Sequence, residues 1–156
     1  MSGIAIVPFQ PALAPHFERL NREWIERYFV LEPPDIAVFE DPHAAIVAPG
    51  GQIFFAVEGD SVLGTCAVLK SAPGEMELAK MAVGPAAQGR GIGRQLGEAA
   101  IAFARNAGAG RLVLISNSRL SPALALYQRL GFRHAPLPHD SGYTRGDVYM
   151  TLDLDR

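Results

Sequence analysis

Residues 88–94 read Gln-Gly-Arg-Gly-Ile-Gly-Arg, with three glycines at the junction of two regular elements. An apolar run ends before them at Val83, and an apolar face with helical spacing begins at Ile92. Glycine lets an anion approach the main chain, and the start of a helix attracts negative charge. We therefore expect residues 88–94 to hold a phosphate group, with a tight turn that merely requires glycine as the alternative.

Two familiar phosphate-binding motifs do not match this spacing. A P-loop ends in Gly-Lys-Ser/Thr, which residues 88–94 lack. A dinucleotide-binding fingerprint needs a third glycine where Arg94 or Leu96 stands, and an acid about twenty residues later, where residues 112–115 are wholly apolar. The loop therefore predicts a different phosphate-bearing ligand.

The strand before the loop shows a slip in its alternation. Larger apolar residues stand at Met76 and Leu78, and then at Met81 and Val83. One extra residue between Leu78 and Met81 would restore the two-residue period, as a β-bulge does, although a strand buried on both faces would also tolerate the pattern. We expect a bulge at this point.

The remaining segments predict one mixed α/β (α+β) sheet with helices. The expected order begins with a strand at 4–7, a helix carrying apolar residues from Leu13 to Tyr28, and a loop with a short helix over 31–51. A hairpin of 53–58 and 62–69 and the strand 76–83 follow, then a helix after Ile92 and an apolar strand at 112–115. A helix within 121–130 and one or two closing strands, one of them at 148–154, complete the order.

Composition is typical of a globular protein. The 156 residues are 49% hydrophobic and 19% charged, enough for one core and too few for two ordinary domains. The net charge of −2 predicts no nucleic-acid or membrane partner. The only cysteine, Cys66, lies within an apolar run and is expected to be a buried structural thiol. No signal pattern or long apolar run is present, so we expect a single cytoplasmic domain over residues 1–156.

The loop and its surroundings resemble the GNAT superfamily of N-acetyltransferases. The resemblance covers residues 77–132 and rests on residues 77–83, on Gln88-x-x-Gly91-x-Gly93, and on the later Asn117, Ala123, Leu126-Tyr127 and Gly131-Phe132. It implies a mixed, mostly antiparallel central sheet with helices on both faces and a bulge that splays the sheet at an acyl-CoA site.

The resemblance also implies roles for the matching residues. The main chain near residues 81–83 would pair with the pantetheine arm, residues 88–94 would hold the pyrophosphate, and Asn117 would bond the pantetheine region. Asn117 by itself is more typical of a turn. The implied donor-binding residues are Met81, Ala82, Val83, Gln88, Gly89, Arg90, Gly91, Ile92, Gly93, Arg94, Asn117, Ala123 and Tyr127.

Attack of an amine on a thioester requires a donor for the oxyanion, an acid for the sulfur and a route for the proton of the amine. The resemblance places Tyr127 near the sulfur as the acid, and a backbone N–H near Met81 or Ala82 is the expected oxyanion donor. Glu77 is the best-placed base. Its alternative is a strand-surface carboxylate paired with a lysine, and Glu26 or Glu32 would serve if the first helix borders the pocket.

The segment 21–43 holds six acidic residues and two arginines. A cationic amine would be attracted there, although an ordinary solvated face has the same charges. The candidates for acceptor binding are Trp24, Tyr28, Glu26 and Glu32, with Asp140, Tyr143 and Arg145 as further ones.

We therefore expect an N-acetyltransferase that moves acetyl from acetyl-CoA to a primary amine of a small molecule or peptide by direct attack in a ternary complex. The four histidines have no metal-ligand spacing, so no metal is expected. The alternative is an acyl-CoA-binding sensor without turnover, which would need the loop but neither Tyr127 nor Glu77. The oligomeric state stays open, with a homodimer as one option.

Overall fold

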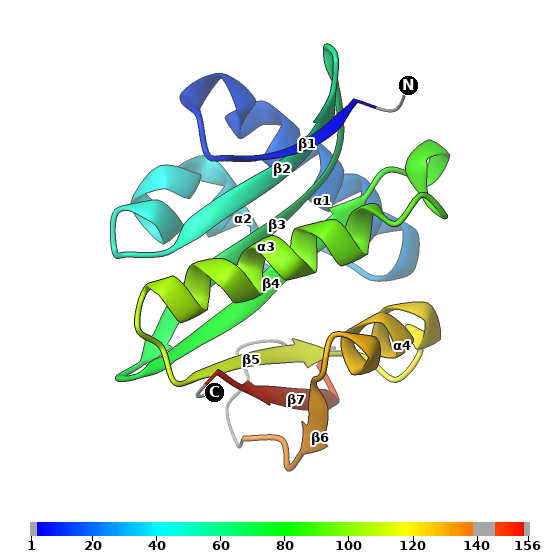
Figure 1. Ribbon diagram of the computed structural model, residues 1–156. Coiled ribbons are helices and arrows are strands. Elements are labelled where there is room, and N and C mark those ends of the chain that lie inside the picture. The colour runs from blue at the N-terminus through cyan, green and yellow to red at the C-terminus, as the bar shows by residue number, and fades with distance from the viewer. Residues whose placement is uncertain (1–2, 139–145, 155–156) are drawn as a thin grey trace.

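The computed structural model describes residues 3–138 and 146–154, and these form a seven-stranded sheet in the order β1-β2-β3-β4-β5-β7-β6 (Figure 1). The strands are β1 (Ile4–Pro8), β2 (Gln52–Glu58), β3 (Ser61–Ala72), β4 (Glu75–Val83), β5 (Arg111–Ser116), β6 (Arg133–Ala135) and β7 (Val148–Asp153). Only β4 and β5 pair in parallel, while the other neighbours are antiparallel. The expected mixed, mostly antiparallel sheet is confirmed.

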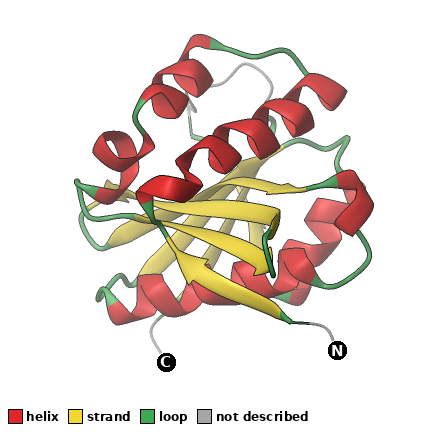
Figure 2. Ribbon diagram, turned by 90° about the horizontal axis from the view of Figure 1, so that it is seen from above, coloured by secondary structure: helices red, strands yellow, loops and turns green. Residues whose placement is uncertain are grey.

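Helices cover both faces of the sheet (Figure 2). The longer ones are α1 (Ala14–Tyr28), α2 (Pro33–Glu40), α3 (Ile92–Asn106) and α4 (Ser121–Arg129), and the short ones are η1 (Pro11–Leu13), η2 (His43–Val47) and η3 (Pro85–Ala87). One buried cluster joins the sheet to α3 and α4 through Leu96 and Tyr127, and a second joins it to α1 and α2 through Phe17 and Phe39. No helix in the described part of the chain is long and apolar enough to cross a membrane.

The segment 31–51 is more regular than the sequence predicted. It contains two helical segments, α2 and η2, where we expected a loop with one short helix. The prolines start these helices and do not interrupt them: Pro33 and Pro34 stand in the first turn of α2, where a missing N–H costs nothing, and Pro42 precedes η2.

The predicted bulge in β4 is confirmed. Ala79 pairs with Ala67 and Ala82 pairs with Thr65, so Lys80 and Met81 together face the single residue Cys66 of β3. Among the described residues other than glycine, only Lys80 has a positive φ, at 55°. One extra residue therefore restores the alternation of β4.

The sheet splits beside the bulge. The parallel ladder joins Glu75–Glu77 to residues 111–113 and continues no further within the described residues. Figure 1 shows β4 and β5 diverging toward the end of the sheet where α4 begins. This split leaves one edge of β4 without a neighbouring strand from Leu78 onward.

Candidate active site

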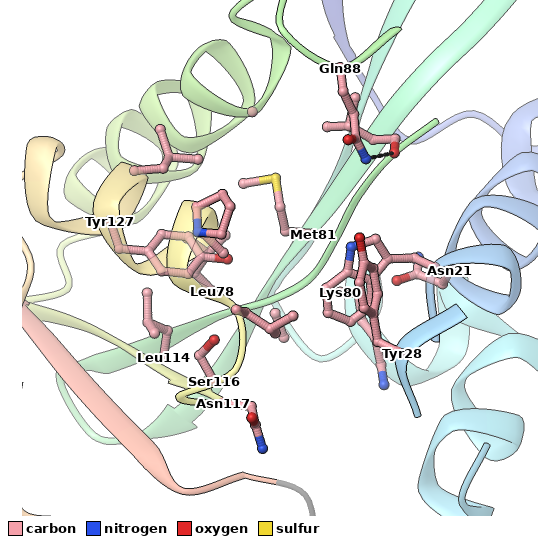
Figure 3. Close-up of a pocket in the computed structure, with 18 of the residues that line it drawn as sticks. Asn21, Tyr28, Leu78, Lys80, Met81, Gln88, Leu114, Ser116, Asn117 and Tyr127 are labelled. Carbon is pink, nitrogen blue, oxygen red and sulfur yellow. Dashed lines mark hydrogen bonds between the residues drawn. The ribbon is translucent and has the colours of Figure 1, made fainter. Parts of the chain in front are cut away.

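A cavity of about 690 Å³ lies where β4 and β5 separate. Its walls come from α1, β4 from Glu77 onward, residues 87–94 apart from Arg90, the end of β5 and α4. Figure 3 shows Tyr127 on one side and Asn21 and Tyr28 on the other, with Met81 between them. Residues distant in the sequence thus meet at the split in the sheet.

Two positions of the loop require glycine because their backbone is left-handed. Gly89 and Gly91 have φ of 85° and 78°, which strains any residue with a side chain, and a Cβ at either would meet no protein atom within 4 Å. No side chain therefore covers the main chain of these two glycines at the start of α3. Gly93 differs, because a Cβ there would lie 3.1 Å from Leu126 Cδ2 of α4 and would crowd the packing of the helices.

The two arginines of the loop occupy different positions. Arg94 lines the cavity and pairs with Glu98 on the next turn of α3 at 3.3 Å. Arg90 pairs with Glu58 on β2 and is not among the residues that line the cavity. Of the other predicted donor-binding residues, Gln88, Ile92, Asn117 and Ala123 line the cavity together with Met81 and Val83, whereas Ala82 is buried and does not.

Tyr127 on α4 lines the cavity with only 8% of the residue exposed. Its ring centre lies 6.0 Å from that of Phe132 in an edge-to-face contact. Burial, and to a smaller extent the neighbouring Cys66, raises the pKa of the Tyr127 hydroxyl. The side chain therefore stays a neutral phenol with a proton to donate near neutral pH.

Glu77 on β4 also lines the cavity. Burial raises the pKa of its carboxyl, Lys80 acts in the opposite direction, and Glu75 adds to the rise. The carboxylate is therefore a stronger base than an exposed glutamate. Lys80, three residues later on the same strand, forms a salt bridge with Asp35.

The pair of Asp35 and Lys80 was not foreseen from the sequence. Lys80 Nζ donates to Asp35 Oδ1 at 2.5 Å across 45 residues of sequence, and Asp35 Oδ2 accepts a hydrogen bond from Glu32 N–H at 2.9 Å. Asp35 is fully buried, and the Lys80 side chain is 8% exposed. The pair ties the bulge of β4 to the first turn of α2.

The acidic residues of segment 21–43 do not converge on the cavity. Trp24 and Tyr28 line it together with Phe29, but Glu26 and Glu32 do not. Glu26 lies two residues from both Trp24 and Tyr28, so it projects from the opposite side of α1. Glu32 precedes α2, where its N–H bonds to Asp35. Asp140, Tyr143 and Arg145 lie outside the described residues.

The end of β5 contributes polar residues to the same cavity. Asn117 Oδ1 accepts a hydrogen bond from Arg119 N–H at 2.8 Å, the turn geometry that its position after a strand predicts. The Arg119 guanidinium lies 5.1 Å from the centre of the Phe29 ring, so it connects this turn to the end of α1. Sequence reasoning missed Asn21, Ser116 and Arg119 among the lining residues, because no local motif marks them.

Comparisons with known sequences point to one family. A model of the acetyltransferase (GNAT) family matches residues 16–132. The uncharacterized N-acetyltransferase YvbK of Bacillus subtilis is 32% identical over 109 residues, which cover 68% of this chain and 70% of that protein. Streptothricin acetyltransferase of Streptomyces lavendulae is 35% identical over 124 residues, which cover 74% of this chain and 65% of that protein.

Solved structures share the fold. An acetyltransferase of the GNAT family from Staphylococcus aureus matches with a TM-score of 0.89 and 17% identity, over 98% of this chain and all of that chain. YncA from Salmonella typhimurium, a putative acetyltransferase solved with acetyl-CoA, matches with a TM-score of 0.77 and 20% identity, over 97% of this chain and 94% of that one. At these identities the likeness concerns the fold.

Proposed function

The chain belongs to the acetyltransferase (GNAT) family, and from this premise we propose that it moves an acetyl group from acetyl-CoA to a primary amine of a small molecule or peptide. Its family and relatives make it an acyltransferase, as the sequence predicted. We propose that residues 1–156 act as a single domain. The observation that carries the proposal is the cavity at the split between β4 and β5, which Glu77 and Tyr127 line from different elements.

The residues of the cavity fit the chemistry of an acyl-CoA. Its pyrophosphate requires N–H donors that no side chain covers, and the bare main chain at Gly89 and Gly91 offers them at the start of α3. Its pantetheine arm carries amides, which suit the edge of β4 that has no strand neighbour beyond Glu77 in the described ladder. We assign the pyrophosphate to residues 88–94, and the arm to the main chain of residues 81–83 with Asn117 and Ala123 nearby.

Three groups of this chain carry the proposed reaction. Glu77 accepts the proton of the amine, directly or through water, as the amine nitrogen bonds to the acetyl carbon. A main-chain N–H at Met81 or Ala82 donates to the acetyl oxygen, where negative charge develops. Tyr127 donates its hydroxyl proton to the sulfur as the carbon–sulfur bond breaks, and this role is supported by its place in the lining of the cavity on α4.

Direct attack, without an acetylated enzyme, is supported by the state of Cys66. This thiol is fully buried, and its Sγ lies 3.6 Å from the carbonyl oxygen of Leu96. Burial raises the pKa of Cys66 to about 12, so the thiolate that a nucleophile requires does not form near neutral pH. The expectation of a buried thiol is confirmed.

The acceptor side favours an amine with an apolar body. Trp24 and Tyr28 have ring centres 5.3 Å apart, and Trp24 and Phe29 have theirs 6.2 Å apart, which gives the cavity an aromatic wall. Since a relative 35% identical to this chain is named streptothricin acetyltransferase, streptothricin is the first small molecule to test as acceptor.

A screen of amines tests the proposal. The purified chain is mixed with acetyl-CoA and each of a set of amines, including streptothricin and short peptides with free amino termini, and release of free thiol is followed with a thiol-reactive dye. Mass spectrometry must show one acetyl group added to the amine. A chain that binds acetyl-CoA in calorimetry but releases no thiol with any amine would favour the sensor instead.

A further inference from the structure

The side chain of Lys80 is itself an amine at the border of the cavity. The bulge gives it a left-handed backbone, with φ of 55°, and takes it out of the alternation of β4. Its four-carbon stem then reaches α2, where the ammonium meets Asp35 and lies 5.8 Å from the centre of the Phe39 ring. The Lys80 ammonium is thus held against α2, although Lys80 lines the same cavity as Glu77.

Glu77 lies three residues before Lys80 and lines the same cavity. The charged or titratable groups around Glu77 are Glu75 and Lys80 on its own strand and Tyr149 on β7, with Tyr28 and Arg119 among the other residues of the cavity wall. Lys80 is the cation in this set that acts on Glu77, since it opposes the rise in the pKa of that carboxyl. Because Glu77 and Lys80 line the same cavity, a Lys80 ammonium that is not held elsewhere competes with a protonated acceptor amine for the Glu77 carboxylate.

We propose that Asp35 is a positioning residue, which holds the Lys80 ammonium against α2 so that Glu77 stays open to the amine of the acceptor. This inference rests on the proposed function, which assigns the base to Glu77, and it adds a role for Asp35. Asp35 suits the task because one of its oxygens binds Lys80 while the other accepts the Glu32 N–H. Both contacts orient the carboxylate, and its complete burial shields the pair from salt and water.

The variant Asp35→Asn tests this role. It retains the size of the side chain and an oxygen for the Glu32 N–H, but it removes the charge that holds Lys80. We expect KM for the amine to rise about tenfold, because a positive charge close to Glu77 competes with the acceptor. Affinity for acetyl-CoA should change little, since the substitution alters neither residues 88–94 nor the main chain of residues 81–83.

A second variant separates this role from simple packing. In Asp35→Asn/Lys80→Met the competing ammonium is gone, so KM for the amine should return to within about twofold of the wild type. Asp41→Asn is the matched control: Asp41 accepts the Ala44 N–H at 3.1 Å near the start of η2, but it is exposed and away from the cavity. A double variant as impaired as Asp35→Asn would mean that Asp35 merely supports α2, and would overturn the proposal.

Titration of Glu77 gives a readout that does not depend on turnover. With ¹³C-labelled glutamate, and Glu77→Gln to assign the signal, the midpoint of Glu77 should fall in Asp35→Asn and rise above the wild type in the double variant. Should Asp35→Asn not fold, Lys80→Gln replaces it and must raise the midpoint. An unchanged midpoint in either single variant overturns the proposal. If the wild type acetylates no amine, the proposed function fails, yet this titration still shows whether Asp35 keeps the Lys80 charge away from Glu77.

Discussion

Arg90 in the glycine loop donates two hydrogen bonds to Glu58 at the end of β2, at 3.1 and 2.8 Å. The hydrogen bond to Arg90 is the main reason that the pKa of the Glu58 carboxyl is lowered, and the same bond raises the pKa of Arg90. The charge of Arg90 is thus directed to β2 and joins the loop to the sheet. Arg94, four residues later, is left as the loop arginine that lines the cavity.

This difference predicts unequal effects of two matched substitutions. Arg94→Gln should weaken acetyl-CoA binding more than Arg90→Gln, because only Arg94 lines the cavity. Calorimetry at low and high salt measures both dissociation constants, and the loss in Arg94→Gln should shrink as salt screens the phosphates. A larger loss in Arg90→Gln would mean that Arg90 leaves Glu58 to bind the ligand.

Gly91→Ala should weaken acetyl-CoA binding by about tenfold. The change strains a left-handed residue, at a cost of roughly 1–2 kcal/mol, and adds a methyl group where we place the pyrophosphate. Gly74→Ala is the control, since Gly74 has a similar φ of 73° and equally open surroundings but lies in the β3–β4 turn. Both variants should lower the thermal stability equally, but only Gly91→Ala should change the affinity for acetyl-CoA. If the two variants bind acetyl-CoA equally well, the pyrophosphate does not lie at this loop.

Tyr127→Phe should retain the fold and the affinity for acetyl-CoA while lowering kcat by roughly 10²-fold, as is typical for loss of a general acid. The ring stays and keeps its contact with Phe132, so packing is preserved. If kcat of Tyr127→Phe equals that of the wild type with chemistry limiting the rate, Tyr127 is a packing residue.

Glu77→Gln should lower kcat/KM most near neutral pH, with partial recovery at high pH, where more of the amine is already deprotonated. In the wild type, kcat/KM should fall as the pH drops through the raised pKa of Glu77, and the variant should lack this limb. Glu26→Gln is the control: its side chain is exposed and does not line the cavity, so its profile should match the wild type. If Glu77→Gln leaves kcat/KM unchanged at every pH, the base is another group.

The variant Glu77→Gln should also unfold at a higher temperature than the wild type at pH 7. A carboxyl whose pKa is raised by folding stabilises the folded state only when protonated, and that stability is lost as the pH rises through the folded pKa. The neutral amide avoids the cost of a buried charge at pH 7. Below the pKa of an unfolded glutamate, about 4.3, the two proteins should differ little. Thermal unfolding followed by circular dichroism at both pH values measures this.

Local sequence was sufficient for the features that depend on neighbouring residues. The slip between Leu78 and Met81 predicted the bulge because side chains alternate with a period of two, so an extra residue is visible in the pattern itself. The glycines of residues 88–94 predicted a bare main chain at the start of α3, since a left-handed backbone excludes most other residues. The order of the main strands and helices followed from the same periodicities, except in segment 31–51, where two helical segments replace the expected one.

Tertiary structure decided which charges face the cavity. Acidic composition over residues 21–43 suggested a cation site, but the direction of each carboxylate depends on the rotation of α1 and on the docking of α2. Glu26 therefore projects away from the cavity and Asp35 is buried against Lys80, 45 residues later. No local pattern records such a contact, because it exists only when a helix and a bulged strand pack together. Local sequence was enough to predict an uncovered main chain before α3, whereas only the packing of the helices on the sheet determined which carboxylates line the cavity.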